Sequence, residues 1–283
     1  MTTRARVSPP AALARRGRLE VEGLAKTYRG KRRTFEAVRD LTFTVEAGEL
    51  ACVVGPSGAG KTTLLRCIAG LLPPSAGAVR LGGEPVLAPP PGMAVVFQEY
   101  ARSLFPWLTV AQNVELPLRQ KKLPKAARHG LVERSLAAVG LADVPGAHPW
   151  QLSGGMQQRV AIARALAYEP DVLLMDEPFA AVDAQTRAEL EDLTRSLWHE
   201  LRMTVLFVTH DIDEAVYLGE QVLVLSASPT VVLDSVAVDL PARREQLATR
   251  ALPRFAELRA EVFTLIQRAK TYHTAPPAGE ARA

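Results

Sequence analysis

The feature that most constrains the fold is a run of five apolar residues that leads directly into a glycine-rich loop. Leu50-Ala-Cys-Val-Val54 contains no polar residue, as expected of a strand that is buried on both faces of a sheet. The loop 55–61 follows, and then residues 62–69 have helical spacing with Gly70 as the C-terminal stop. A buried strand, a glycine loop and a helix in this order predict an α/β fold with a parallel sheet.

The same loop predicts a phosphate-binding site. Gly55-Pro-Ser-Gly-Ala-Gly-Lys61-Thr62 matches G-x-x-x-x-G-K-[ST] at every fixed position. Glycine permits the backbone angles that turn successive N–H groups toward a phosphate. Lys61 can reach the outer phosphates, and the Thr62 hydroxyl suits Mg²⁺. An ordinary glycine-rich turn is the alternative, and the order of strand, loop and helix weighs against it. The residues expected around the phosphates are Gly55, Pro56, Ser57, Gly58, Ala59, Gly60, Lys61, Thr62 and Thr63.

A second apolar run, Val172-Leu-Leu-Met175, ends in two carboxylates, Asp176 and Glu177. Parallel sheets bind ligands at the carboxyl ends of their strands, so these acids should lie beside the glycine loop. Asp176 is suited to hold Mg²⁺, directly or through water, and Glu177 to polarise an attacking water. Adjacent strand residues otherwise point to opposite faces, which would leave one of the two acids solvated.

Other patterns complete an alternation of strands and helices. Leu190, Leu193, Leu197 and Leu201 share one face of a predicted helix. The remaining predictions are apolar strands at 93–97, 205–208 and 222–225, short β-patterned runs within 19–87, a mainly helical stretch at 101–168 and a last helix at 255–267.

These patterns divide the chain into a tail, a main domain and an extension. Residues 1–17 are rich in Arg, Ala and Pro without periodicity and are predicted to be disordered. Residues 18–240 form the main domain, with a helical subdomain at about 100–160. Residues 241–272 form a C-terminal extension with a helix, and 273–283 a flexible tail.

Composition excludes some classes of protein. No stretch approaches the 18 or so apolar residues of a membrane span, and no apolar core follows the N-terminal arginines, so they do not form a secretory signal. The net charge of +4 fits a solvated tail, attraction to anionic lipids or nucleic-acid binding; no recognisable nucleic-acid-binding module supports the last. Cys52 and Cys67 have apolar neighbours and are interpreted as reduced core residues of a cytoplasmic protein.

A third motif makes the pattern specific. Leu152-Ser-Gly-Gly-Met-Gln-Gln-Arg159 precedes a helical run through Ala167. Ser153 could be only the N-cap of that helix, but two glycines at a helix N-terminus also form a second anion-binding device. The octapeptide resembles the signature sequence of ABC ATPases, and with the phosphate loop and the acidic strand it identifies the chain as a member of that family over about 19–235.

The resemblance implies a P-loop NTPase, RecA-like α/β core with an antiparallel β-subdomain and an inserted α-helical subdomain. In this family two domains, often identical, dimerise head to tail around two ATP molecules. Each ATP then contacts the phosphate loop of one chain and Ser153, Gly154 and Gly155 of the other. The implied enzyme is an ATP hydrolase coupled to transmembrane transport, in the translocase class EC 7.

Four further residues match the family residue by residue. Tyr28 stands where an aromatic ring stacks on adenine, and Gln98 where a glutamine senses Mg²⁺ and water and links to the membrane partner. Asp183 matches the acid that reaches across the dimer, and His210 the switch histidine at the γ-phosphate. Tyr28 could instead be an exposed strand-end aromatic, His210 a strand end before a helix cap, and Gln98 alone carries no signal. The loop Ala180-Ala-Val-Asp183 departs from the usual Gly-Ala-Leu-Asp, and we expect the chemistry to survive.

Four segments are similar to the importer branch that serves nitrate, sulfonates, taurine or related small molecules: Phe105-Pro-Trp107, His148 to Gly155, Ser196 to Glu200 and Thr209 to Ala215. That branch implies permease subunits, a periplasmic or lipid-anchored binding protein, a peripheral place on the cytoplasmic membrane face and no nucleic acid. The surface at 105–108 would then contribute to a groove for a permease helix, unless its apolar residues are core. An exporter ATPase, a soluble ABC protein and a catalytically inactive regulatory subunit are the alternatives.

Overall fold

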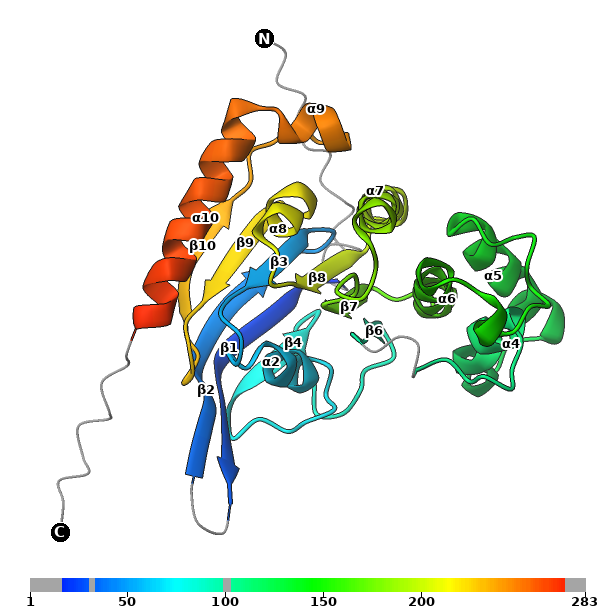
Figure 1. Cartoon of the computed structure of the whole chain (residues 1–283). Helices are drawn as coiled ribbons and strands as arrows, with labels where there is room; N and C mark the ends of the chain where they lie inside the picture. The colour runs from blue at the N-terminus through cyan, green and yellow to red at the C-terminus, as the bar shows by residue number, and fades with distance from the viewer. Residues whose placement is uncertain (1–16, 31–33, 99–102, 273–283) are drawn as a thin grey trace.

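Two β-sheets and their covering helices make up the computed structural model, which describes residues 17–30, 34–98 and 103–272 (Figure 1). One sheet has four antiparallel strands in the order β2-β1-β4-β5, and the other has six in the order β10-β9-β3-β8-β7-β6. All neighbours in the larger sheet are parallel except β10 and β9. The strands are β1 (Leu19–Arg29), β2 (Thr34–Val45), β3 (Leu50–Val54), β4 (Ala76–Leu81), β5 (Glu84–Pro85), β6 (Met93–Val96), β7 (Val172–Asp176), β8 (Thr204–Val208), β9 (Gln221–Leu225) and β10 (Val232–Ala237).

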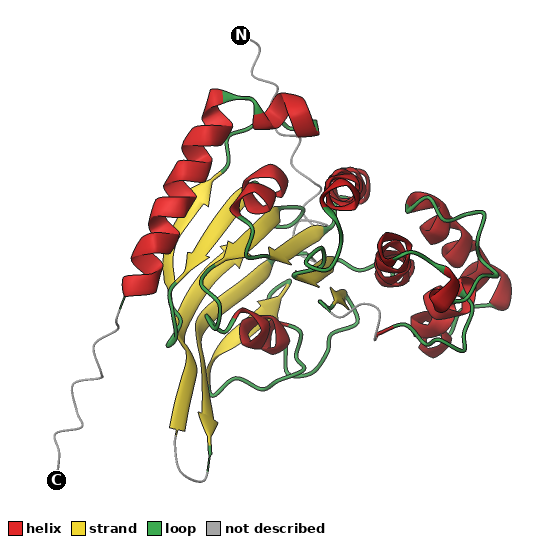
Figure 2. Cartoon of the chain, in the orientation of Figure 1, coloured by secondary structure: helices red, strands yellow, loops and turns green. Residues whose placement is uncertain are grey.

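The helices divide between the two faces and one edge of the larger sheet (Figures 1 and 2). The helix α2 lies with the antiparallel sheet on one side, and α7, α8 and α10 contribute to the core on the other. The helices are α2 (Lys61–Ile68), α4 (Val110–Glu115), α5 (Lys125–Ala138), α6 (Gly154–Ala167), α7 (Ala184–Leu201), α8 (Ile212–Leu218), α9 (Gln246–Arg250) and α10 (Pro253–Thr271), with 3₁₀ turns η1 (Leu116–Gln120) and η2 (Pro149–Gln151).

The central strand β3 is buried on both faces, as its sequence predicts. Its five residues are fully buried. Leu50, Cys52 and Val54 belong to the core beneath the helices, whereas Ala51 and Val53 belong to the core shared with α2 and the antiparallel sheet. The predicted α/β fold with a parallel central sheet is therefore confirmed, and β3 carries the glycine loop out of the middle of the core.

The helical segment forms a group beyond the β6 edge of the sheet (Figure 1). Leu131 and Leu136 are buried within it, and Gly140 follows α5 with a φ of 72°. Arg164 of α6 donates hydrogen bonds to the carbonyl (2.6 Å) and hydroxyl (2.7 Å) of Ser103. These contacts tie the helical group to the chain that leaves β6.

One face of α7 is shorter than its leucine pattern predicts. Leu190 and Leu197 are buried, but Leu201 is 55% exposed. The helix ends there because Arg202 has a left-handed conformation with a φ of 52°. The prediction that Leu201 lies on the buried face is wrong, because the last turn extends past the core.

The C-terminal segment packs into the core. Phe255, Leu258 and Val262 of α10 are buried and belong to the core cluster that includes α7 and α8. Of the predicted tails, 1–16 and 273–283 lie outside the described residues. Gly17 is described, and its carbonyl accepts a hydrogen bond of 2.6 Å from Thr204 Oγ1. Within the described ranges, no helix has both the length and the apolar character that crossing a membrane requires.

Candidate active site

The glycine loop between β3 and α2 is built to receive an anion. Gly58 and Gly60 have φ values of 77° and 69°, in the left-handed region that favours glycine. A Cβ on Gly60 would lie 3.1 Å from the carbonyl oxygen of Ala37, whereas a Cβ on Gly58 would meet open space. No side chain caps the N-terminus of α2, so its first N–H groups remain available to a phosphate.

Lys61 lies across this loop with only 8% of its surface exposed. Its Nζ donates hydrogen bonds to the carbonyls of Gly55 (3.0 Å) and Pro56 (3.1 Å). Burial lowers the pKa of Lys61, while the nearby carboxylates of Glu177 and Asp176 oppose that shift. The ammonium group is thus held by neutral carbonyls that an incoming phosphate can replace.

Asp176 and Glu177 both reach the loop, although they are adjacent in sequence. Asp176 ends β7, is 3% exposed and accepts a hydrogen bond from the Thr62 hydroxyl. Glu177 has a φ of 43° and donates its N–H to the Val208 carbonyl at 2.8 Å. This left-handed turn, uncommon for a residue with a side chain, interrupts the strand alternation that would send the two carboxylates to opposite faces.

Three side chains from separate parts of the chain converge on Glu177. His210 Nδ1 lies 3.0 Å from Glu177 Oε2, and Gln98 Nε2 donates to the same oxygen at 3.4 Å. Lys61 Nζ lies 4.0 Å from Oε1. The Glu177 cluster, by which we mean Lys61, Gln98, Asp176, Glu177 and His210, therefore forms at the carboxyl ends of the parallel strands, with Glu177 at its centre.

His210 serves at once as a strand end and as part of this cluster. It follows β8, and Asp211 behind it caps α8 by accepting hydrogen bonds from the N–H groups of Asp213 (2.9 Å) and Glu214 (3.2 Å). The side chain of His210 is 60% exposed, so its ring is open to a ligand.

Tyr28 lies over the first turn of α2. Its hydroxyl is 3.2 Å from Thr63 Oγ1, and its side chain is 41% exposed. An exposed ring that is anchored next to the phosphate loop is placed to stack on a base. Tyr28 is thus an exposed aromatic near the end of β1, and its stacking on a base stays a prediction.

The signature residues and Asp183 form a second group. Ser153 caps α6 by accepting from the Met156 N–H at 3.3 Å. Asp183 caps α7 by accepting from Thr186 N (3.0 Å) and Thr186 Oγ1 (2.7 Å). A Cβ on Gly155 would lie 2.4 Å from Thr186 Cγ2, so Gly155 permits the close approach of α6 and α7. Among the described residues, no hydrogen bond or ion pair joins this second group to the Glu177 cluster.

Sequence reasoning missed the loop after β9 that supports the phosphate loop. Thr230 Oγ1 donates to the Ala59 carbonyl at 2.5 Å, and Ser228 Oγ donates to the Glu36 carbonyl at 3.0 Å. More than 160 residues separate each pair, and no local pattern marks them. Thr186, which contacts both Gly155 and Asp183, was also missed.

Comparison with known proteins places the chain in a family. The sequence profile described as ABC transporter matches residues 38–180, just over half of the chain. An uncharacterized ABC transporter ATP-binding protein of Methanocaldococcus jannaschii is 44% identical, over 88% of this chain and 91% of that protein. The nitrate import ATP-binding protein NrtD of Synechocystis is 40% identical, over 90% and 97%. The dimeric ATP-binding cassette MJ0796, solved in a post-hydrolysis state with ADP and Pi, superposes with a TM-score of 0.69 at 32% identity, over 78% of this chain and 98% of that one.

The chain therefore belongs to the ABC transporter family, with the P-loop NTPase fold that the sequence predicted. It is an ATP-binding subunit, and its ATP hydrolysis is coupled to transport. Cassettes of this kind form dimers.

Proposed function

We propose that this chain is the ATP-hydrolysing subunit of an importer that takes up a small solute of the nitrate, sulfonate or taurine class. The observation that carries the hydrolytic role is the convergence of Lys61, Gln98 and His210 on the Glu177 carboxylate. The 40% identity to a nitrate import ATP-binding protein over nearly its whole length supports the importer role. The ATPase of another ABC system, such as an exporter or a soluble ABC protein, is the alternative.

In the proposed mechanism the chain positions the γ-phosphate and the attacking water. Glu177 accepts a hydrogen bond from that water and orients it, while His210 contacts the γ-phosphate from the other side of the carboxylate. Lys61 exchanges its loop carbonyls for the outer phosphates. The N–H groups of residues 57–63 surround the remaining phosphate oxygens, and Tyr28 stacks on adenine.

The residues also suit Mg²⁺. Thr62 and Asp176 are hydrogen-bonded to each other at the loop, and together they offer the hard oxygen ligands that Mg²⁺ prefers. Gln98 reaches the same carboxylate cluster and can contribute its amide oxygen. The ion would neutralise charge on the phosphates. Removal of the ion by a chelator should abolish hydrolysis.

Two chains would complete each site. The second group, Ser153, Gly154, Gly155 and Asp183, would contact the nucleotide held by the phosphate loop of a partner copy, in a head-to-tail homodimer. This arrangement explains why the chain carries two anion-binding helix N-termini without a contact between them.

The membrane partner would dock on the helical side. A groove of about 650 Å³ lies between β6 and the helical group and is lined by residues such as Val95, Leu116, Arg119 and Tyr168. Residues 105–108, which the resemblance assigns to such a groove, do not line this one. Trp107 is 70% exposed and contacts Phe105 edge to face with ring centroids 5.3 Å apart, whereas Leu104 is buried. A permease helix seated here would place the chain at the cytoplasmic face of the membrane, served by a substrate-binding protein on the other side.

The test is ATP hydrolysis by the purified chain reconstituted with the neighbouring permease in lipid vesicles. We expect stimulation by the permease and a loaded binding protein, and the stimulating solute identifies the cargo. Hydrolysis that responds to no permease would instead favour a soluble ABC protein.

A further inference from the structure

The contacts of α8 suggest how the chain holds His210 in place. The helix α8 begins two residues after His210, so its position sets the distance between His210 and Glu177. We propose that Arg250 of the C-terminal extension is a positioning residue for His210, because it clamps α8 onto α7. The proposal rests on the proposed ATP-hydrolysing function and assigns a part of that function to the extension.

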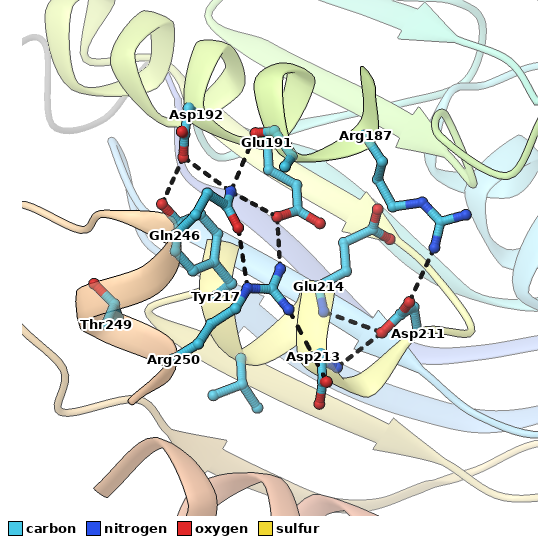
Figure 3. A network of polar contacts seen from close by, with 12 residues as sticks. Arg187, Glu191, Asp192, Asp211, Asp213, Glu214, Tyr217, Gln246, Thr249 and Arg250 are labelled. Carbon is cyan, nitrogen blue, oxygen red and sulfur yellow. Dashed lines mark hydrogen bonds and ion pairs between the residues drawn. The ribbon is translucent and has the colours of Figure 1, made fainter. Parts of the chain in front are cut away.

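Arg250 bridges α7 and α8 directly (Figure 3). Its Nη2 donates to Glu191 Oε2 of α7 at 2.7 Å, and its Nη1 lies 4.0 Å from Asp213 Oδ2 of α8. The guanidinium carbon also lies 5.0 Å from the centre of the Tyr217 ring on α8, a cation–π distance. One side chain therefore contacts both helices through charge, hydrogen bonds and an aromatic face.

Gln246, four residues earlier on α9, completes the clamp. Its Nε2 donates to Glu191 Oε2 (2.9 Å) and Asp192 Oδ1 (3.0 Å), while its Oε1 accepts from Arg250 Nε at 3.0 Å. Tyr217 donates its hydroxyl to the same oxygen of Asp192 at 2.5 Å. The clamp, defined as Glu191, Asp192, Tyr217, Gln246 and Arg250, thus joins α7, α8 and α9.

The clamp reaches His210 through the first turn of α8. Asp211, which caps that turn, accepts a hydrogen bond from Arg187 Nη1 of α7 at 3.2 Å. Arg259 of α10 forms an ion pair with Asp213, with Nε 2.7 Å from Oδ1. Since His210 directly precedes Asp211, movement of α8 relative to α7 changes the 3.0 Å contact between His210 and Glu177. It also changes the spacing between His210 and Asp183, which caps the start of α7.

Removing Arg250 alone would leave the 2% exposed Glu191 without its cation and risks unfolding. The test variant is therefore the double substitution E191Q/R250M, which removes both charges at nearly constant volume. The matched control is R254A. Arg254 follows Arg250 by four residues and belongs to α10. It pairs with Asp239 and Glu257 rather than with residues of α7 or α8.

The experiment measures ATP hydrolysis by each variant assembled with its permease, with single-turnover assays of labelled ATP for slow variants. We expect E191Q/R250M to lower kcat about tenfold with little change in KM, since small displacements of a reacting group have effects of this size. R254A should match the wild-type protein. In an H210A background, E191Q/R250M should cause no further loss, because its effect passes through His210.

Three results would overturn the proposal: wild-type kcat in E191Q/R250M, a rise in KM without a fall in kcat, or an equal loss in the H210A background. Failure of the proposed function has a different signature, because the wild-type assembly itself would then not hydrolyse ATP. Hydrogen exchange at the amides of α8 supplies a second measurement. It should rise in E191Q/R250M and stay unchanged in R254A.

Discussion

Two buried or half-buried glutamates, Glu177 and Glu191, lie at the centres of neighbouring polar clusters and are held in contrasting ways. Glu177 is 19% exposed, and its partners stand at 3.0, 3.4 and 4.0 Å. Glu191 is 2% exposed and accepts hydrogen bonds of 2.7 and 2.9 Å from Arg250 and Gln246. Glu177 keeps contacts that a phosphate and a water can replace, whereas Glu191 is closed off from solvent and both of its partners hold the one oxygen Oε2.

The two carboxylates differ in their exposure to solvent and in the distances to their partners. Buried charges are tolerated when paired and hydrogen-bonded, and Glu191 meets that condition. Glu177 instead has a left-handed backbone conformation, a strain that is typical of functional sites, and its three contacts range from 3.0 to 4.0 Å. The two clusters are connected by α8, so each can be perturbed while the other is observed.

The largest expected effect comes from substitution of Glu177. E177Q should bind ATP normally but hydrolyse it about 10³-fold more slowly, because the amide cannot act as a base toward water. Binding of a fluorescent ATP analogue and phosphate release measure the two properties separately. Turnover within a factor of two of the wild-type rate would remove Glu177 from the base role.

Substitutions in the clamp around Glu191 should change the stability of the protein rather than its nucleotide binding. R250A leaves a buried carboxylate unpaired and should lower the free energy of unfolding by about 3 kcal/mol. Denaturant unfolding measures this loss. The exposed pair of Arg254 and Asp239 offers the control, since solvent screens it and R254A should leave stability nearly unchanged. Similar losses in the two variants would show that the clamp is no stronger than a surface ion pair.

A smaller effect is expected where α6 meets α7. G155A would force a methyl group against Thr186 Cγ2 and should cost about 1–3 kcal/mol of stability through overpacking. T186S removes that methyl but keeps the hydroxyl that donates a hydrogen bond to Asp183. The double variant G155A/T186S should therefore recover the lost stability in the same unfolding assay. If activity stays low while stability returns, Gly155 also acts at the nucleotide; if stability does not return, Thr186 is not the obstacle.

The smallest effect concerns Glu214, which lies between the two clusters. Burial raises its pKa from 4.5 to about 8, with Glu191 and Asp211 adding to the shift and Thr209 and Arg187 opposing it. Between pH 5 and 8 the unfolded chain releases this proton and the folded chain keeps it, so stability falls as the pH rises. The melting temperature of the wild-type protein should therefore fall more than that of E214Q over this range. Parallel curves in calorimetry would contradict the assigned protonation state.

The sequence predicted the parts of the site that depend on local pattern. The apolar runs 50–54 and 172–175, the glycine loop and the caps at Ser153 and Asp211 are each encoded within a few residues, and β3, β7, α6 and α8 follow them. The resemblance to ABC ATPases added Tyr28, which could otherwise be an exposed strand-end aromatic, and Gln98, which carries no signal alone.

What the sequence could not predict depends on distant packing. Arg250 and Gln246 contact Glu191, at least 55 residues away, in a segment read only as an extension. The left-handed turn at Glu177 was not expected of a non-glycine residue. Leu201 fits the leucine stripe but lies beyond the point where the core ends. Each of these features is set by where another element lies rather than by its own neighbours.

The central claim is that one chain carries two halves of a nucleotide site, which a second copy completes. Light scattering of E177Q with and without ATP and Mg²⁺ tests it most directly. The account predicts that the molar mass doubles on adding ATP, and that a further S153R substitution, which blocks the second group, keeps the chain monomeric. A molar mass that stays monomeric with bound ATP, or that doubles equally in the S153R variant, would contradict it.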